Sequence, residues 1–172
     1  MTSPPPFTSF EEMIDVFDDR PMPGAPFAEA VTRFFRRYAV LTGRASRSEY
    51  WWVILFHGLV YLMWAALLVA AWTVGRRVEA DISGAADGST GSVALVVVLA
   101  GFGTYWLATL VPTIALRTRR LHDAGFSGWF QLLSLVPYVE IAVIVLTLLP
   151  SNPSGRRYDR PFPDDWDEPQ AA

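Results

Sequence analysis

The chain has 172 residues, a length typical of one domain. Hydrophobic residues make up 52% of it, and they gather in long runs that a single water-soluble core of this size could not bury. The absence of Cys excludes disulfides, zinc–thiolate sites, iron–sulfur clusters and thiol nucleophiles. With only two His, no metal site and no cofactor is expected.

The net charge of −3 conceals an uneven distribution. Residues 1–20 and residues 159–172 each carry five acidic residues and one Arg, whereas the segment between them is basic. We therefore expect acidic, Pro-rich, disordered tails over residues 1–25 and 159–172 around a membrane domain at 26–158. The acidic start has no long apolar run before residue 50, so we expect no cleavable signal peptide and an uncleaved first membrane helix instead.

Residues 26–39 carry an amphipathic helical pattern. Apolar side chains recur on one face and charged ones lie largely on the other: Phe27, Val31, Phe34, Phe35 and Tyr38 against Glu29, Arg33, Arg36 and Arg37. A helix with a basic polar side beside a membrane segment is typical of the membrane interface. Packing of this helix on a soluble partner is the alternative.

Three apolar runs predict transmembrane helices over residues 50–74, 93–116 and 129–150. At about 1.5 Å rise per residue, each run is long enough to cross about 30 Å of hydrocarbon. The fold class predicted from these patterns is an all-α membrane protein, with three transmembrane helices after the juxtamembrane amphipathic helix.

Local signals refine the first two membrane helices. Ser46 and Glu49 form a capping box that predicts the start of the first helix. In the second helix, Gly101 and Gly103 predict close helix contact, and Pro112 predicts a kink.

The arginines favour one side of the three predicted crossings. Apart from Arg20 in the acidic tail, eight lie before the first helix or directly after the second, and five, with acidic residues around them, lie on the other side. The positive-inside rule then predicts a cytoplasmic N-terminus and an external C-terminus. If Pro137 divides the third segment into a re-entrant hairpin, the C-terminus returns to the cytoplasm.

Two charged motifs flank the first pair of membrane helices. The first contains Gly43, Arg44, Arg47, Glu49, Tyr50 and Trp51, and the second contains Arg119, Arg120, Leu121, His122, Asp123, Ser127 and Trp129. With these motifs in this order, residues 27–158 resemble the bacterial inner-membrane family known as domain of unknown function 805. The family's Gly-x-Asn-x-Tyr-Gly tail pattern is matched only in part by residues 155–159. The resemblance implies the architecture and a multi-pass inner-membrane location, and it carries no established activity.

In the three-helix interpretation both motifs lie on the cytoplasmic membrane surface. We expect Arg44 or Arg47 to approach Asp123, or Glu49 to approach Arg119 or Arg120. The structural interpretation is helix capping, ion pairing and anchoring of Arg to anionic lipid, at about 1 kcal/mol for each interfacial Arg. A defined headgroup or ligand site and a catalytic site are the alternatives. A general base at His122 is weakly indicated, because adjacent residues such as His122 and Asp123 do not face each other on a helix.

Two ionisable residues fall inside predicted spans. Glu140 lies near the centre of the third, where a charged side chain costs roughly 3 kcal/mol on insertion scales and marks a functional-site hypothesis. Since hydrocarbon disfavours the charged form, Glu140 should face another helix, with Thr104, Tyr105 or His57 as its partner. His57 is the other titratable group within a span.

The leading hypothesis is a small, non-enzymatic inner-membrane protein whose basic cytoplasmic face binds anionic lipid headgroups or a protein partner, with no role in nucleic-acid binding. The first alternative is a transport or channel component that uses Glu140 and assembles as a homo-oligomer or with another membrane protein, because three helices are too few to enclose a pathway. The second alternative is a membrane enzyme that acts on a phosphorylated lipid.

Overall fold

The computed structural model describes residues 20–81, 89–136 and 138–159. All regular structure in these residues is helical, in agreement with the predicted all-α class. The elements are α2 (Phe27–Arg36), α3 (Arg47–Asp81), α4 (Ser89–Asp123), η1 (Gly128–Leu135), α5 (Glu140–Leu148) and η2 (Pro153–Tyr158), where η marks a 3-10 helix. Most of the predicted tail sequence, residues 1–19 and 160–172, lies outside the described residues.

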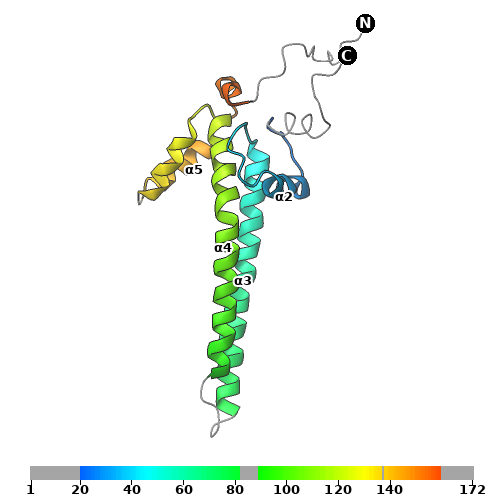
Figure 1. Cartoon of the computed structure of the whole chain (residues 1–172), viewed down its shortest axis with the longest axis vertical. Coiled ribbons are helices and arrows are strands. Elements are labelled where there is room, and N and C mark those ends of the chain that lie inside the picture. The colour runs from blue at the N-terminus through cyan, green and yellow to red at the C-terminus, as the bar shows by residue number, and fades with distance from the viewer. Residues whose placement is uncertain (1–19, 82–88, 137, 160–172) are drawn as a thin grey trace.

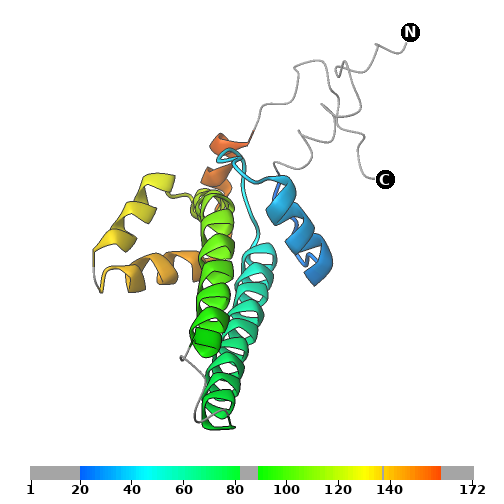
Figure 2. The same ribbon diagram turned by 60° about the horizontal axis from the view of Figure 1, so that its bottom comes forward.

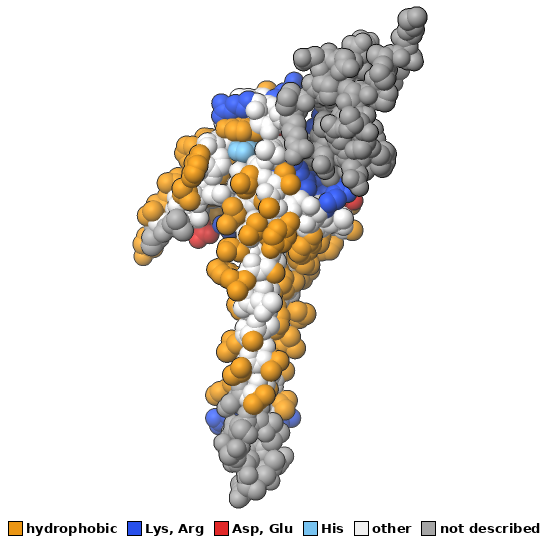
Figure 3. Space-filling model, in the orientation of Figure 1, with side chains coloured by type: hydrophobic (Ala, Val, Ile, Leu, Met, Phe, Trp, Pro, Cys, Tyr) orange, Lys and Arg blue, Asp and Glu red, His pale blue; other side chains and the backbone are white. Residues whose placement is uncertain are grey.

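Helices α3 and α4 form a long antiparallel hairpin (Figure 1). Each helix has 35 residues and is therefore about 52 Å long, more than the roughly 30 Å of hydrocarbon in a bilayer. Only 11% and 6% of the most apolar window of each helix is buried, so neither is the core helix of a soluble domain. Their apolar side chains cover the outside of the hairpin (Figure 3). The first two predicted spans, 50–74 and 93–116, lie within these helices.

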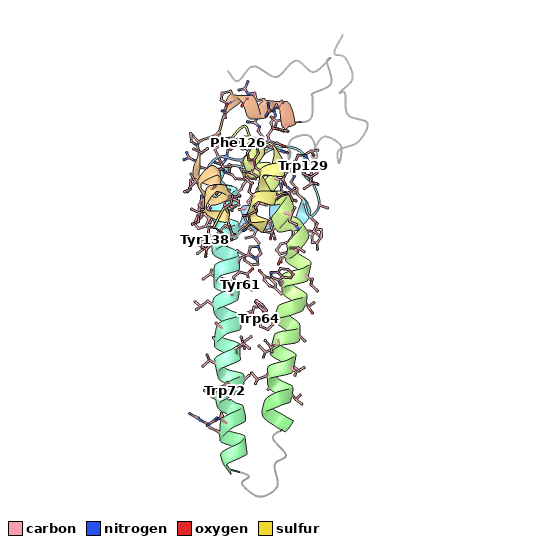
Figure 4. All side chains as sticks on the ribbon, turned by 90° about the vertical axis from the view of Figure 1, so that its left-hand side faces the viewer. Tyr61, Trp64, Trp72, Phe126, Trp129 and Tyr138 are labelled. Carbon is pink, nitrogen blue, oxygen red and sulfur yellow. The ribbon has the colours of Figure 1, made fainter. Side chains whose placement is uncertain are left out.

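Aromatic rings and a glycine pack the middle of the hairpin, where the Tyr61 and Trp64 rings of α3 contact the Phe102 ring of α4. Gly101 faces the Trp64 ring so closely that a Cβ at this position would lie 2.6 Å from a ring carbon. Gly103 faces open space, so the predicted close contact holds for Gly101 and does not extend to Gly103. Nearer the charged end, His57 Nδ1 and the Tyr105 hydroxyl form a hydrogen bond of 2.6 Å between the two helices. Figure 4 shows Tyr61 and Trp64 in the same space between α3 and α4.

Helix α4 continues through Pro112, which is buried. Proline has no backbone N–H, so the carbonyl of Ala108, four residues earlier, loses its ordinary helical donor. The Tyr38 hydroxyl donates a hydrogen bond of 2.6 Å to this carbonyl. The residues after α2 thus supply the donor that Pro112 lacks, and they connect to α4 at this point.

The third predicted span, 129–150, is not one helix, which corrects the three-helix prediction. It consists of η1 and α5, which Val136 to Val139 connect, and Tyr138 has a positive φ of 69°. Residues before proline avoid the α conformation, and Val136 before Pro137 is extended. Eight residues of 3-10 helix and nine of α-helix are roughly 16 Å and 14 Å long, so neither could cross a bilayer. We call η1 and α5 together the arm.

The arm and α2 lie on opposite sides of the hairpin (Figures 1 and 2). Helix α2 buries Ala30, Arg33 and Phe34 against its neighbours and leaves Phe27 and Phe35 partly exposed. The core cluster of the described residues forms where α2, α3 and α4 meet: Phe34, Ala45, Tyr50, Val53 and Leu116. We call this end of the molecule, residues 20–50, 115–127 and 149–159, the head.

Candidate functional site

The first charged motif caps the N-terminus of α3. Ser46 Oγ accepts a hydrogen bond from the Glu49 backbone N–H at 3.2 Å, and the Glu49 carboxylate accepts one from the Ser46 N–H at 2.7 Å. This is the predicted capping box. The same carboxylate accepts a hydrogen bond from the Met22 N–H and lies 3.2 Å from Arg33 Nε of α2. Glu49 therefore joins three segments, and its partner is Arg33, not the predicted Arg119 or Arg120.

The segment before α2 is attached to the same place. The Trp52 indole N–H donates to the Ala25 carbonyl at 2.8 Å, and the Ala25 N–H donates to Ser48 Oγ at 3.1 Å. Arg33 donates to the Arg20 carbonyl at 2.9 Å. Residues 20–25, which the sequence assigns to the acidic tail, are thus part of the head.

The second charged motif is buried at the end of α4. Arg120 and Asp123 are fully buried and form an ion pair one helical turn apart. Arg120 also donates to the carbonyls of Thr147 and Leu149, at the end of the arm, and Asp123 accepts from the Ser151 hydroxyl at 2.6 Å. A buried charge is tolerated when its partners satisfy it in this way. These two residues hold the arm and the C-terminal segment against α4.

Arg44 connects the two motifs. Its Nη1 lies 3.7 Å from Asp123 Oδ1, which confirms the predicted approach of Arg44 to Asp123. Its Nε and Nη2 donate to the Asp159 carboxylate at 2.8 and 2.6 Å, a bidentate geometry that suits the guanidinium plane. Arg47, the other predicted partner, is exposed on the first turn of α3.

His122 packs on the C-terminal 3-10 helix. Its ring stacks on Tyr158 with centroids 3.7 Å apart and an interplanar angle of 4°. Nδ1 lies 3.2 Å from the Gly43 carbonyl oxygen, and because a carbonyl only accepts, Nδ1 is the donor. In the neutral ring Nε2 is then an acceptor. The Gly43 backbone N–H also donates to the Tyr158 carbonyl at 2.9 Å, so residues of the first motif and of the tail together position this ring.

Two glycines allow this packing. Gly125 ends α4 with φ 86°, and the hydrogen bonds from Gly125 to His122 and from Phe126 to Leu121 form a Schellman motif. Gly155 of η2 lies directly against the His122 backbone, where a Cβ would collide with the carbonyl oxygen. The tail pattern around residue 155 is therefore a docking surface for the end of α4.

A cavity of about 620 Å³ opens beside His122, between α4, η1 and η2. We call it the head cavity. His122, Thr118, Gln131 and Arg157 give it polar groups. Its remaining walls are mainly apolar or aromatic side chains and Gly128: Leu41, Ile114, Leu132, Trp129 and Tyr158, together with Thr42 and Ser127. Such a mixture of apolar walls and few polar groups is typical of a small-molecule site.

The predicted site residues thus divide into two groups. Arg44, Glu49, Arg120 and Asp123 bind other parts of the chain, and Arg119 is buried with its backbone carbonyl bonded to the Ala45 N–H. His122, Ser127 and Trp129 line the head cavity, and Ser127 also caps η1. Sequence reasoning missed Arg157 and Tyr158 as cavity residues. Their signal was the partial tail motif at residues 155–159.

The two ionisable residues predicted inside membrane spans, Glu140 and His57, do not line the head cavity. Glu140 is the first residue of α5, where a carboxylate suits the helix dipole, and its side chain is 54% exposed. The predicted position at the centre of a span is therefore wrong. Its ion-pair partner is Arg117 of α4 at 3.9 Å, in place of the predicted Thr104, Tyr105 or His57. His57 is buried and bonded to Tyr105.

Across the described ranges, no group of three or more His, Asp or Glu side chains could hold a metal ion. The carboxylate of Asp123 faces Arg120 and Ser151, while the His122 ring is oriented by the Gly43 carbonyl. The two adjacent residues therefore do not form an Asp–His pair.

Two inner membrane proteins of Escherichia coli are similar to this chain over most of its length. The chain is similar to the inner membrane protein YhaI of Escherichia coli strain K12, with 29% identity over 120 residues that cover 70% of this chain and 82% of YhaI. It is also similar to the inner membrane protein YhaH of the same strain, with 26% identity over 127 residues that cover 73% of this chain and 89% of YhaH. No solved structure matches the chain. The model of a family described as "Protein of unknown function (DUF805)" matches residues 38–160, so the chain belongs to that family.

Proposed function

We propose that this protein lies in the bacterial inner membrane as a two-helix hairpin, with its head in the cytoplasm and its arm in the cytoplasmic leaflet. The names of YhaI and YhaH support the location. Eleven of the thirteen described arginines lie at the head end, and only Arg76 and Arg77 lie at the other, which supports the orientation. Arg20 and Asp159 both contact the head, so the two ends of the described chain are on one side.

The apolar arm supports its placement in the membrane. Trp129 and Tyr138 are 78% and 89% exposed, and Ile141 and Val145 are also exposed. An apolar surface of this kind needs lipid or a partner to cover it. Figure 1 shows the arm projecting sideways from the head, beside the hairpin and on the side of the head that would face the bilayer.

We further propose that the protein is non-enzymatic and that its head cavity binds the headgroup of an anionic phospholipid. The head cavity carries this proposal because it combines a cation with apolar walls. Arg157 contacts Gly125 and the Tyr158 hydroxyl through Nη2 only, which leaves other guanidinium donors for a phosphate. The neutral His122 ring would accept a hydrogen bond at Nε2 from a headgroup hydroxyl. Phosphatidylglycerol offers both the phosphate and the hydroxyls.

This proposal narrows the predicted basic binding surface to one cavity. Arg119 and Arg120 are buried, so they are not available to lipid in the way that interfacial anchoring requires. The binding role shifts to Arg157 and His122. A protein partner in the cavity would be the alternative outcome of the test below.

Lipid binding can be measured by native mass spectrometry of the full chain released from detergent micelles. Phosphatidylglycerol should bind at least several-fold more tightly than phosphatidylcholine. Arg157→Gln should weaken phosphatidylglycerol binding about tenfold, because it removes a charge-assisted hydrogen bond. Arg156→Gln is the matched control, since Arg156 is exposed and outside the head cavity. Equal binding of the two lipids, or equal loss in both variants, would contradict the proposal.

The topology has its own test. A reporter that is active only in the cytoplasm should be active when fused after Ala172, because the hairpin and arm return the chain to the side where it entered. Activity of a periplasmic reporter at the same position would restore the three-crossing model.

A further inference from the structure

A second cavity lies under the arm. It has a volume of about 440 Å³ and lies between α4 and η1, closer to the middle of the hairpin than the head cavity. The two cavities share a wall made by Ile114, Gln131 and Leu132. We call the second one the arm cavity. One charged side chain, Arg117, lines this cavity. Its guanidinium takes no part in the buried ion pairs of the head.

Arg117 is incompletely paired. Its Nη2 lies 3.9 Å from Glu140 Oε1, at the long limit of an ion pair, and Glu140 is more than half exposed. Its Nε is buried and, within the described chain, has no hydrogen-bond partner. A desolvated guanidinium N–H without an acceptor is unfavourable, so an additional oxygen ligand would stabilise it.

The level of Arg117 along the hairpin matches the membrane surface. The Ala45 N–H bonds the Arg119 carbonyl, so this part of α4 lies beside the start of α3, just before the exposed Trp51 and Trp52. Aromatic belts of this kind mark the headgroup level of a bilayer. The arm cavity therefore begins where lipid phosphates and carboxylates lie.

The arm cavity changes character with depth. Arg117 and Gln131 lie toward the head, whereas Tyr61, Trp106 and Leu110 lie toward the middle of the hairpin. The Thr109 and Ser134 hydroxyls donate to nearby backbone carbonyls. Arg117 is then the only cationic group of this cavity in the described residues, above an apolar base.

We propose that the arm cavity binds an anionic amphiphile, with its oxyanion on Arg117 and one acyl chain along Trp106 and Leu110. The oxyanion is the carboxylate of a fatty acid or the phosphate of a lysophospholipid. This site is separate from the head cavity, because its cation is Arg117 and not Arg157. Glu140 competes with the ligand for the same guanidinium.

The test uses the full chain in micelles with four probes: palmitate, lysophosphatidylglycerol, lysophosphatidylcholine and inorganic phosphate. Native mass spectrometry should show tight binding of at least one of the first two probes and weak binding of the last two. The tighter of palmitate and lysophosphatidylglycerol identifies the source of the oxyanion. Inorganic phosphate that binds as well as either would overturn the role of the acyl chain.

Three substitutions locate the bound amphiphile on the protein. Arg117→Gln should weaken binding about tenfold or more, whereas Arg76→Gln, at the far end of the hairpin, should leave it unchanged. Arg157→Gln should also leave it unchanged, so failure here and failure of the head-cavity proposal are distinguishable. Unchanged binding in Arg117→Gln, with the variant still eluting as a folded species, would overturn the inference.

Glu140→Gln should change the affinity for the amphiphile in the opposite direction to Arg117→Gln. If Glu140 competes with the ligand, its neutral variant should bind the amphiphile several-fold more tightly. If the Arg117–Glu140 pair instead holds the arm in place, Glu140→Gln should weaken binding as Arg117→Gln does. That second result would overturn the proposal. The Arg117–Glu140 pair would then only fix the position of the arm, and Glu140 would not compete with a ligand.

Discussion

The head and the hairpin are held together by opposite means. In the hairpin, apolar side chains face outward. The contacts between α3 and α4 include a glycine beside Trp64, the Tyr61 and Trp64 rings against Phe102, and the His57–Tyr105 hydrogen bond. In the head, charged side chains face inward, and Arg120 and Asp123 are fully buried. The hairpin therefore exposes apolar side chains that a soluble protein would bury (Figure 3), and the head buries charged side chains that a soluble protein would expose.

The difference follows from what surrounds each region. Helices in lipid gain little from burying apolar surface, so close packing and a few polar bonds are enough to pair them. The head brings together short segments that lie far apart between residues 20 and 159. Its apolar core cluster has five residues, at the point where α2, α3 and α4 meet. Multidentate Arg–carboxylate bonds fix these segments in one arrangement, provided every charge has its partner.

The largest expected effect comes from breaking the buried charge pair. Asp123→Asn leaves Arg120 without a counter-charge in a dry site, which should cost about 3–5 kcal/mol of head stability. Thermal denaturation of the detergent-solubilised protein should show a lowered midpoint. The matched control is Glu29→Gln, which removes the exposed Glu29–Arg36 pair and should cost less than about 1 kcal/mol. Equal effects would mean that buried charges do not hold the head.

A smaller and more local loss of stability is expected from a substitution at Gly155. In Gly155→Ala the new methyl group meets the His122 carbonyl, and backbone cannot move aside easily, so η2 should detach at a cost of about 1–3 kcal/mol. Hydrogen exchange should then increase over residues 149–159 while the hairpin amides keep their protection. Unchanged exchange in the C-terminal segment would show that η2 does not dock on α4 in this way.

The hairpin should respond more weakly to the same kind of change. Gly101→Ala places a methyl against the end of the Trp64 ring, which can rotate, so a cost of about 1 kcal/mol is expected. Gly103→Ala, two residues away in open space, is the control and should be neutral or slightly stabilising. Thermal midpoints in the same micelle compare the two, and a larger loss in Gly103→Ala would contradict the helix pairing described above.

The smallest expected effect is at the contact between the two regions. Tyr38→Phe removes the donor to the Ala108 carbonyl and should cost up to about 1 kcal/mol, since Tyr38 is partly exposed. In a Pro112→Ala background residue 112 regains an N–H, so the helix can satisfy this carbonyl itself. Tyr38→Phe should then cost nothing, and a double-mutant cycle measures the difference. Additive costs would show that the hydroxyl does not replace the proline donor.

Features set by neighbouring residues were predictable from sequence. The start of α3 follows from Ser46 and Glu49, which lie within one helical turn and need no distant partner. The hairpin follows from two apolar runs that are long enough to cross a bilayer, and membership of the family follows from motif order. The approach of Arg44 to Asp123 was also predictable, because two antiparallel helices bring their flanking motifs to one end.

Tertiary structure alone decided the rest. A hydropathy window averages over residues 129–150 and does not detect the break beside Pro137. The sequence therefore placed Glu140 at the centre of a span, whereas it is the first residue of α5. Sequence also could not tell whether an Arg side chain meets lipid or another residue. Arg120 is bonded to carbonyls at residues 147 and 149, and Arg44 to Asp159, over separations of 27 to 115 residues. Whether a charge is buried depends on such distant partners, and only the folded chain brings them together.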